Sequence, residues 1–141
     1  MIPLYDIQTK FEGERPLIWG QIRKAWYVWQ PEEVVRQQLI SHLIHDKGIS
    51  PNLIGVEKEI VYNQTRRRFD VVVFDKMGQP FVLVECKAPD VKLDSDTLFQ
   101  AARYNSILQA PYLILFNGKT WVFFSKNEEG FFSISPGEWY K

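Results

Sequence analysis

The spacing of apolar and polar residues predicts two helices along the chain. Apolar residues recur at helical spacing between Pro31 and Gly48, and proline suits the first position of a helix while glycine suits the position after its end. A second helix is expected to begin near Asp94 or Ser95, since either side chain can cap it, and to run to about Gln109. Outside these two segments the periodicity is that of strands.

Strands are predicted between the two helices. Residues 53–62 alternate between apolar and polar side chains, and residues 63–68 are expected to form a polar turn. Two near-continuous apolar runs, VVVF and FVLV, follow, and a short polar turn at residues 76–79 joins them. Such runs are typical of strands covered on both faces, so we expect an antiparallel hairpin inside the fold.

After the second helix the chain returns to strands. The run PYLILFN predicts a buried strand, Asn117-Gly118 is a strong hairpin signal, and residues 120–125 complete that hairpin. The run FFSI near the end adds one more short strand. The order of helix, three strands, helix and two strands predicts an α/β or α+β fold built around one sheet.

Residues 1–30 have a different character. Trp19, Trp26, Tyr27 and Trp29 stand among polar residues without a helical period. The run IWGQIRKAWYVW predicts one or two extended segments laid over the core. We therefore expect an aromatic-rich N-terminal extension on a single domain that spans residues 1–141.

Composition excludes several classes of protein. Apolar residues make up 45% of the chain and aromatic residues 15%, which is too apolar for a disordered protein. Lys plus Arg and Asp plus Glu number 17 each, so any nucleic-acid-binding surface must be a local patch. The single cysteine excludes an intramolecular disulfide and suits a reducing compartment. With no visible signal peptide or membrane-spanning run, we expect a cytoplasmic protein without membrane contact.

Within the predicted hairpin, two acids and a lysine are expected to converge. Asp70 lies as far before the turn centre at Met77 and Gly78 as Glu85 lies after it, so antiparallel pairing places the two acids opposite each other. Their Cβ atoms would then be roughly 5 Å apart. Lys87 follows two residues after Glu85 and returns to the same face of the strand. Two carboxylates and an amine on one face outline a metal-ion hydrolysis site.

Opposed carboxylates destabilise a sheet unless something offsets their repulsion. A divalent cation, Mg²⁺ or Mn²⁺, held by Asp70 and Glu85 would do so, because Mg²⁺ prefers oxygen ligands. The alternative is that Asp70, Glu85 and Lys87 simply stand at exposed strand ends. The apolar runs that end at these charged residues favour the site, because they indicate strands buried on both faces.

The two helices carry further candidates for the same site. The mean direction of the apolar residues in the first helix points closer to Glu32 than to Glu33, although both acids also suit the positive end of a helix dipole. On the second helix, Gln100 and Tyr104 are four residues apart and share a face. An ordinary boundary pair would show the same spacing, so both interpretations stay open.

A dense positive run precedes the first acid. Arg66, Arg67 and Arg68 end two residues before Asp70, and Arg103 would reinforce them if the second helix packs nearby. These arginines would either clamp a phosphate backbone or form a solvated turn.

Two other chemistries find little support. His42 and His45 lie three residues apart on the first helix without a third metal ligand. Cys86 alternates with Glu85 and Lys87 and is expected to be a small core residue.

The order of these segments resembles a known family. Asp70 and Glu85-x-Lys87 between two helices are similar to the PD-(D/E)xK nuclease superfamily. More specifically, five segments resemble the N-terminal domain of type I restriction enzyme R subunits in a small stand-alone form. They are RKAWYVWQPEEVVRQQLISHLI, RRRFDVVVFD, VLVECKAP, QAARYN and APYLILFNG, and they extend from about Ile18 to Phe124. The resemblance implies a restriction-endonuclease-like core, with a central mixed sheet of about five strands flanked by helices.

The resemblance also implies roles for the candidate acids and the lysine. Asp70 and Glu85 would bind the metal, and Lys87 would orient water or stabilise developing charge. The helix acid would be Glu33 by family usage, whereas the direction of the apolar face favours Glu32.

On the second helix the resemblance assigns Gln100 and Tyr104 to a QxxxY element that contacts DNA or supports the site. The sequence departs from the superfamily where Phe69 stands in place of proline. Type I R subunits continue into a helicase motor, for which 141 residues leave no room, so we do not expect a complete restriction subunit.

Three functions are compatible with these observations. The leading hypothesis is an Mg²⁺- or Mn²⁺-dependent endonuclease that hydrolyses phosphodiester bonds in DNA. The second is a catalytically silent module that keeps the fold and binds nucleic acid or a protein partner. The third is a homodimer that uses the tryptophan-rich N-terminal segment as its interface. The first two differ in whether Asp70, Glu85 and Lys87 catalyse the cleavage of nucleic acid.

Overall fold

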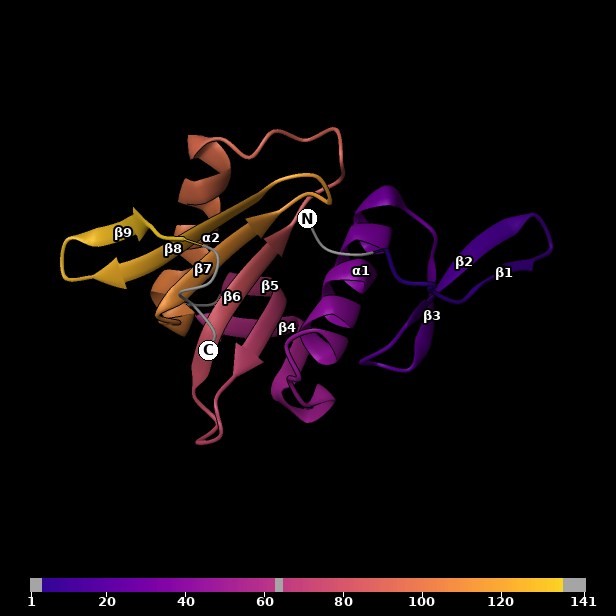
Figure 1. Cartoon of the computed structure of the whole chain (residues 1–141), viewed down its shortest axis with the longest axis horizontal. Helices are drawn as coiled ribbons and strands as arrows, with labels where there is room; N and C mark the ends of the chain where they lie inside the picture. The colour runs from indigo at the N-terminus through magenta and orange to yellow at the C-terminus, as the bar shows by residue number, and fades with distance from the viewer. Residues whose placement is uncertain (1–3, 63–64, 136–141) are drawn as a thin grey trace.

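The computed structural model describes residues 4–62 and 65–135; for residues 58–62, 65–68 and 104 it describes the backbone and not the side chain. Within this part of the chain the strands form two sheets, one of three strands and one of six (Figure 1). In chain order the elements are β1 (Thr9–Glu12), β2 (Arg15–Gly20), β3 (Ala25–Val28), α1 (Pro31–His45), the 3-10 helix η1 (Pro51–Leu53), β4 (Ile54–Tyr62), β5 (Thr65–Phe74), β6 (Pro80–Cys86), α2 (Ser95–Leu108), β7 (Tyr112–Phe116), β8 (Trp121–Asn127) and β9 (Gly130–Ser133).

The larger sheet has the strand order β4-β5-β6-β7-β8-β9 and is mixed. Strands β6 and β7 are parallel, whereas the other neighbouring strands are antiparallel. A parallel pair needs a crossover connection, which α2 provides. The prediction of an α+β fold around a mixed sheet is confirmed. The described strands of this sheet number six where about five were expected, because the FFSI segment pairs with β8 as β9.

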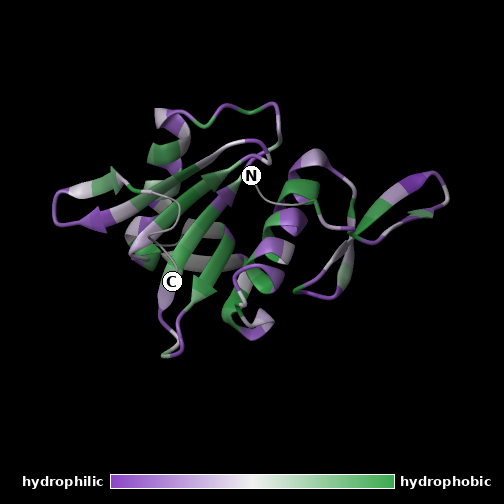
Figure 2. Ribbon diagram, viewed as in Figure 1, coloured by the Kyte–Doolittle hydropathy of each residue, from purple (hydrophilic) through white to green (hydrophobic). Residues whose placement is uncertain are grey.

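Helices cover both faces of the large sheet. Leu39, Ile40 and Leu43 of α1 are fully buried against one face. On the other face, Ala101 of α2 packs in a second apolar cluster with Leu83. Each fully buried leucine or isoleucine stabilises the fold by roughly 1.5–3 kcal/mol. Figure 2 shows the pattern behind this packing: the central strands are mostly hydrophobic, whereas the hairpin ends are hydrophilic.

The β5–β6 hairpin has the predicted register. Val71 pairs with Val84 at the end of the ladder, so the same register, continued by one residue, places Asp70 opposite Glu85. Gly78 adopts a φ of +81° in the turn, a conformation that glycine tolerates without steric cost. The ladder shifts only close to this turn, and the expected opposition of the two acids is retained.

Strand β5 begins earlier than the sequence indicated. Residues 65–68 pair with β4, so the expected polar turn over residues 63–68 is wrong for this part, while residues 63–64 lie outside the described residues. The reason is that β4 is nine residues long and offers backbone partners along its length. Pairing of these backbone groups outweighs the low strand propensity of polar residues.

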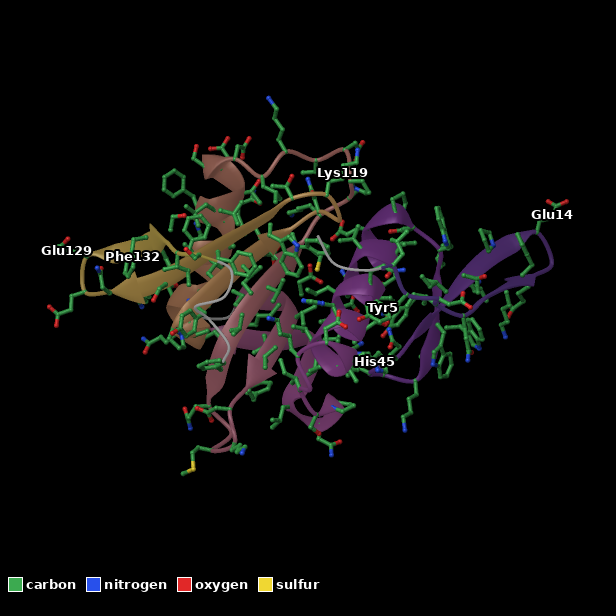
Figure 3. The ribbon with its side chains drawn as sticks, viewed as in Figure 1. Tyr5, Glu14, His45, Lys119, Glu129 and Phe132 are labelled. Carbon is green, nitrogen blue, oxygen red and sulfur yellow. The ribbon has the colours of Figure 1, made fainter. Side chains whose placement is uncertain are left out.

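The N-terminal region forms a sheet of its own, where one or two segments laid over the core were expected. β1, β2 and β3 are an antiparallel meander, and α1 separates them from the large sheet (Figure 1). Tight turns at Gly13 and at residues 21–24 let each strand pair with the next. The chain before β1 lies along α1, where Tyr5 exchanges two hydrogen bonds with Gln38 and stacks on His45, with ring centroids 5.7 Å apart (Figure 3).

Both helices begin where expected. Pro31 opens α1, and Asp94 caps α2 by accepting a hydrogen bond from the Thr97 N–H at 3.1 Å. Helix α1 ends at His45, slightly before the predicted Gly48. In the described part of the chain, no helix has the length and apolar character needed to cross a lipid bilayer.

Candidate active site

A cavity of about 170 Å³ lies where α1, α2 and the strands β4, β5 and β6 meet. It brings together five residues predicted from the sequence: Glu32, Asp70, Glu85, Lys87 and Gln100. Two further charged residues, which the sequence did not single out, also line it. The complete lining is Glu32, Arg36, Glu57, Phe69, Asp70, Glu85, Lys87 and Gln100.

Asp70 is held by two different elements. One carboxylate oxygen, Oδ1, accepts a hydrogen bond from Arg36 Nε of α1, and the other, Oδ2, accepts one from the backbone N–H of Cys86 at 2.7 Å. The residue is only 8% exposed. Burial raises the pKa of Asp70, while the Arg36 charge and the Cys86 N–H act in the opposite direction. The carboxylate is therefore fixed in orientation by its partners.

Glu85 faces Asp70 but has fewer polar partners. It is also 8% exposed, and no hydrogen bond from the described residues reaches its carboxylate. Its ion-pair partner is the Lys87 ammonium, with 3.8 Å between Nζ and Oε2. Burial, followed by the negative charge of Asp70, raises the pKa of Glu85 to about 7. A positive charge placed between the two acids would favour the ionised form of both.

Lys87 lies just beyond β6. Its backbone N–H donates to the Phe116 carbonyl of β7 at 2.9 Å, which extends the parallel pairing by one residue. Its side chain is 27% exposed and lines the cavity. The backbone is thus anchored, while the ammonium remains accessible to a bound molecule.

Arg36 connects the cavity acids and was not predicted. Besides Asp70, its guanidinium contacts Glu33 at 2.5 Å, Glu57 at 3.5 Å and Glu32 at 3.7 Å. Burial alone would lower the pKa of Arg36, but the charges of Asp70 and Glu33 more than offset it and raise the pKa. The sequence held one signal, because Arg36 follows Glu32 and Glu33 at the spacing of helical neighbours.

Glu57 is the second residue that the sequence did not single out. The pairs Val56–Val71 and Lys58–Phe69 flank it, which places Glu57 across from Asp70 on β4. Its φ of +50° is rare for a residue with a side chain. The same turn arithmetic that places Glu85 opposite Asp70 would have found Glu57, had residues 65–68 been recognised as strand.

The two acids at the start of α1 occupy different environments. Glu33 is the more buried and accepts hydrogen bonds from Arg36 and from Gln37 at 3.1 Å. Glu32 is half-exposed and lines the cavity. The prediction from the apolar face, which favoured Glu32, is therefore wrong in terms of burial, since Glu33 is the acid that is buried and bound by Arg36 and Gln37. The choice of site acid between them stays a prediction.

Of the remaining candidates, Gln100 of α2 lines the cavity, whereas the side chain of Tyr104 lies outside the described part. Arg103 is exposed and is not part of the cavity lining. The arginines that precede Asp70 belong to β5, and their side chains are not described: Arg66, Arg67 and Arg68.

Cys86 and the histidines have structural environments. Cys86 is fully buried in the apolar cluster under α1, as expected, and burial raises the pKa of its thiol well above the usual value. His42 lies 2.6 Å from the Asp46 carboxylate, and His45 stacks on Tyr5. Both histidines are therefore engaged by neighbours outside the cavity.

The donor atoms of the cavity suit a hard divalent cation. Mg²⁺ usually takes one or two protein carboxylates and keeps several waters, which matches Asp70 and Glu85 facing each other. Among the residues that the structure describes, no three Asp, Glu, His or Cys side chains are arranged to enclose a metal. Asp70 and Glu85 are therefore the residues that would hold such a cation, with water completing its coordination.

Comparison with known proteins identifies a family for this chain. A family model described as type I restriction enzyme R protein N terminus (HSDR_N) matches residues 31–135. The match includes every residue that lines the cavity and leaves the N-terminal sheet outside. A search of curated proteins found no match. Because the model matches most of the 141 residues, the chain belongs to the family of type I restriction enzyme R protein N-terminal domains.

Proposed function

We propose that this domain hydrolyses phosphodiester bonds in DNA with the help of Mg²⁺ or Mn²⁺. One observation carries the proposal: Asp70, Glu85 and Lys87 line a single cavity in which the pKa of Glu85 is raised to about 7. Such a shift, caused by burial and a facing carboxylate, is characteristic of functional sites. Family membership supports restriction chemistry as the setting.

Each residue has a role that follows from its environment. Asp70 and Glu85 would hold the cation, and Arg36 fixes the orientation of the Asp70 carboxylate. The cation, when bound, supplies positive charge at the scissile phosphate and lowers the pKa of a bound water. Lys87, 3.8 Å from Glu85, would orient the attacking water or stabilise charge that develops on a phosphate oxygen. Gln100, which also lines the cavity, would hydrogen-bond the substrate.

The position of the arginine run supports DNA as the substrate. Residues 66–68 belong to β5 and lead directly to Asp70 on the same strand. Arginines neutralise phosphates and so position a nucleic-acid strand without reading its sequence. A phosphate backbone bound there would run close to the cavity.

The proposal is tested by incubating the purified protein with supercoiled plasmid, linear DNA and RNA, each with Mg²⁺, with Mn²⁺ and with EDTA. We expect nicking of DNA with either metal and none with EDTA. Asp70→Asn should abolish nicking while retaining a cooperative thermal unfolding transition. A wild-type protein that cuts none of these substrates with either metal would contradict the proposal.

A second function is favoured by the contacts of Asp70. Both of its carboxylate oxygens already accept hydrogen bonds from protein donors, and one donor is a guanidinium. Arg36 would then take the place of the cation, and the domain would be a silent module that binds nucleic acid or a protein partner. DNA binding that weakens with salt but is unaffected by Glu85→Gln, without any cleavage, would favour this alternative.

A further inference from the structure

The turn between β2 and β3, residues 21–24, is linked to two of the acids that pair with the Arg36 guanidinium: directly to Glu57, and through Gln37 to Glu33. On one side Arg23 donates to the backbone carbonyl of Glu57 at 3.1 Å, and its guanidinium lies 3.7 Å from the Glu57 carboxylate. On the other side Gln21 binds Gln37, which in turn binds Glu33. The turn lies outside the segment that the family model matches.

The link through Gln21 is a continuous chain of hydrogen bonds. The backbone N–H and the side-chain amide of Gln21 donate to the Gln37 side-chain oxygen at 3.2 and 3.1 Å, and the amide also donates to the Gln37 carbonyl at 3.1 Å. Gln37, almost fully buried, donates to Glu33 Oε2 at 3.1 Å. Glu33 Oε1 then lies 2.5 Å from Arg36 Nη1. Buried amide networks of this kind fix side-chain orientation.

The link through Arg23 acts on a strained residue. Glu57 holds a φ of +50°, and such backbone strain persists only where surrounding contacts impose it. Arg23 is one of those contacts, although 48% of its side chain is exposed. Glu57 shares the Arg36 Nη1 atom with Glu33, at 3.5 and 2.5 Å. The two links therefore meet on the same nitrogen.

We propose that the β2–β3 turn is a positioning element of the site: by binding Glu33 through Gln37 and Glu57 directly, it holds Arg36 against Asp70. The N-terminal sheet then contributes to the geometry of the site, although it does not line the cavity. The effect of the turn on cation binding rests on the proposed function, because Arg36 orients Asp70, one of the two carboxylates that would hold the cation.

The direct test is nuclear magnetic resonance of the Arg36 Nε–H in the metal-free, full-length protein. Three variants are compared with wild type: Gln21→Ala/Arg23→Ala, the milder Arg23→Ala, and Arg15→Ala as a control on the same sheet. Arg15 is exposed and does not line the cavity. We expect exchange of the Nε proton with water about tenfold faster in the double variant, an intermediate rate in Arg23→Ala and no change in the control. Exchange equal to wild type in the double variant would overturn the proposal.

A second measurement connects the turn to the site. Mn²⁺ alone is titrated into each variant, and thermal unfolding confirms that each is folded. We expect roughly tenfold weaker Mn²⁺ binding in the double variant than in wild type and Arg15→Ala. Faster Nε exchange with unchanged Mn²⁺ affinity would overturn the role of the turn in the site. If wild type binds no Mn²⁺, the proposed function fails, while the exchange rates still decide whether the turn positions Arg36.

Discussion

The guanidinium of Arg36 on α1 binds the carboxylate of Asp70 on β5 through its Nε atom. The buried Arg36 guanidinium thus connects the acids at the start of α1 with Asp70, the first acid of the hairpin. Glu85, which faces Asp70, receives no comparable partner from the described residues. The site therefore contains one carboxylate fixed by Arg36 and the Cys86 N–H, and one whose ion-pair partner is the Lys87 ammonium.

Removal of Arg36 is expected to destabilise the protein strongly. In Arg36→Met the carboxylates of Glu33 and Asp70 lose a buried partner, and loss of one member of such a pair typically costs about 3–5 kcal/mol. Urea denaturation at neutral pH measures the change in free energy of unfolding. A loss below about 1 kcal/mol, the range of exposed ion pairs, would show that Arg36 is not the buried link described here.

The stability of the metal-free protein should fall as the pH rises. The folded-state pKa of Glu85 is raised from 4.5 to about 7, so the folded protein binds more protons than the unfolded chain between these values. The free energy of unfolding therefore decreases from about pH 4.5 to about pH 7, and this shift corresponds to about 3 kcal/mol. Urea denaturation as a function of pH should show this slope in wild type and a clearly smaller one in Glu85→Gln. Equal slopes would exclude Glu85 as its source.

Glu57 provides a test of backbone strain. Because its φ is +50°, Glu57→Gly should be more stable than Glu57→Ala by about 1 kcal/mol, even though glycine normally weakens a strand. Both variants lose the carboxylate, so their difference in thermal or urea denaturation isolates the backbone conformation. If alanine is the more stable replacement, residue 57 does not hold a left-handed conformation.

Cys86 is expected to be structural. Its backbone N–H binds Asp70, whereas its side chain is buried in the apolar cluster under α1. Cys86→Ala should therefore retain nuclease activity while losing about 1 kcal/mol of stability. Plasmid nicking and thermal unfolding, measured on the same preparation, test both parts. A large loss of activity in a folded Cys86→Ala protein would indicate a chemical role for the thiol.

Much of the site followed from the sequence because the hairpin register depends on local information. A short turn between two apolar runs determines which residues face each other, and this was sufficient to place Asp70 opposite Glu85. Lys87 followed from strand periodicity, whereas Gln100 was assigned to the site by the family resemblance.

Arg36 and Glu57 depend on non-local packing. The partner of a helix residue is determined by how α1 docks on the sheet, which periodicity does not contain. The position of Glu57 depends on the β4–β5 register, which the sequence does not reveal because the polar residues 65–68 resemble a turn. The N-terminal meander was predicted only as one or two extended segments, because its strands are short and their polar and aromatic residues show no clear period.

The most direct test of the central claim is the initial rate of plasmid nicking by wild type and Lys87→Ala at saturating Mn²⁺, with Arg15→Ala as the control. Lys87→Ala leaves both carboxylates in place, so cation binding should persist while the stabilising ammonium is lost. We predict nicking by wild type and Arg15→Ala, and a rate slower by about 100-fold or more in Lys87→Ala. Equal rates in wild type and Lys87→Ala, or no nicking by wild type, would contradict the account.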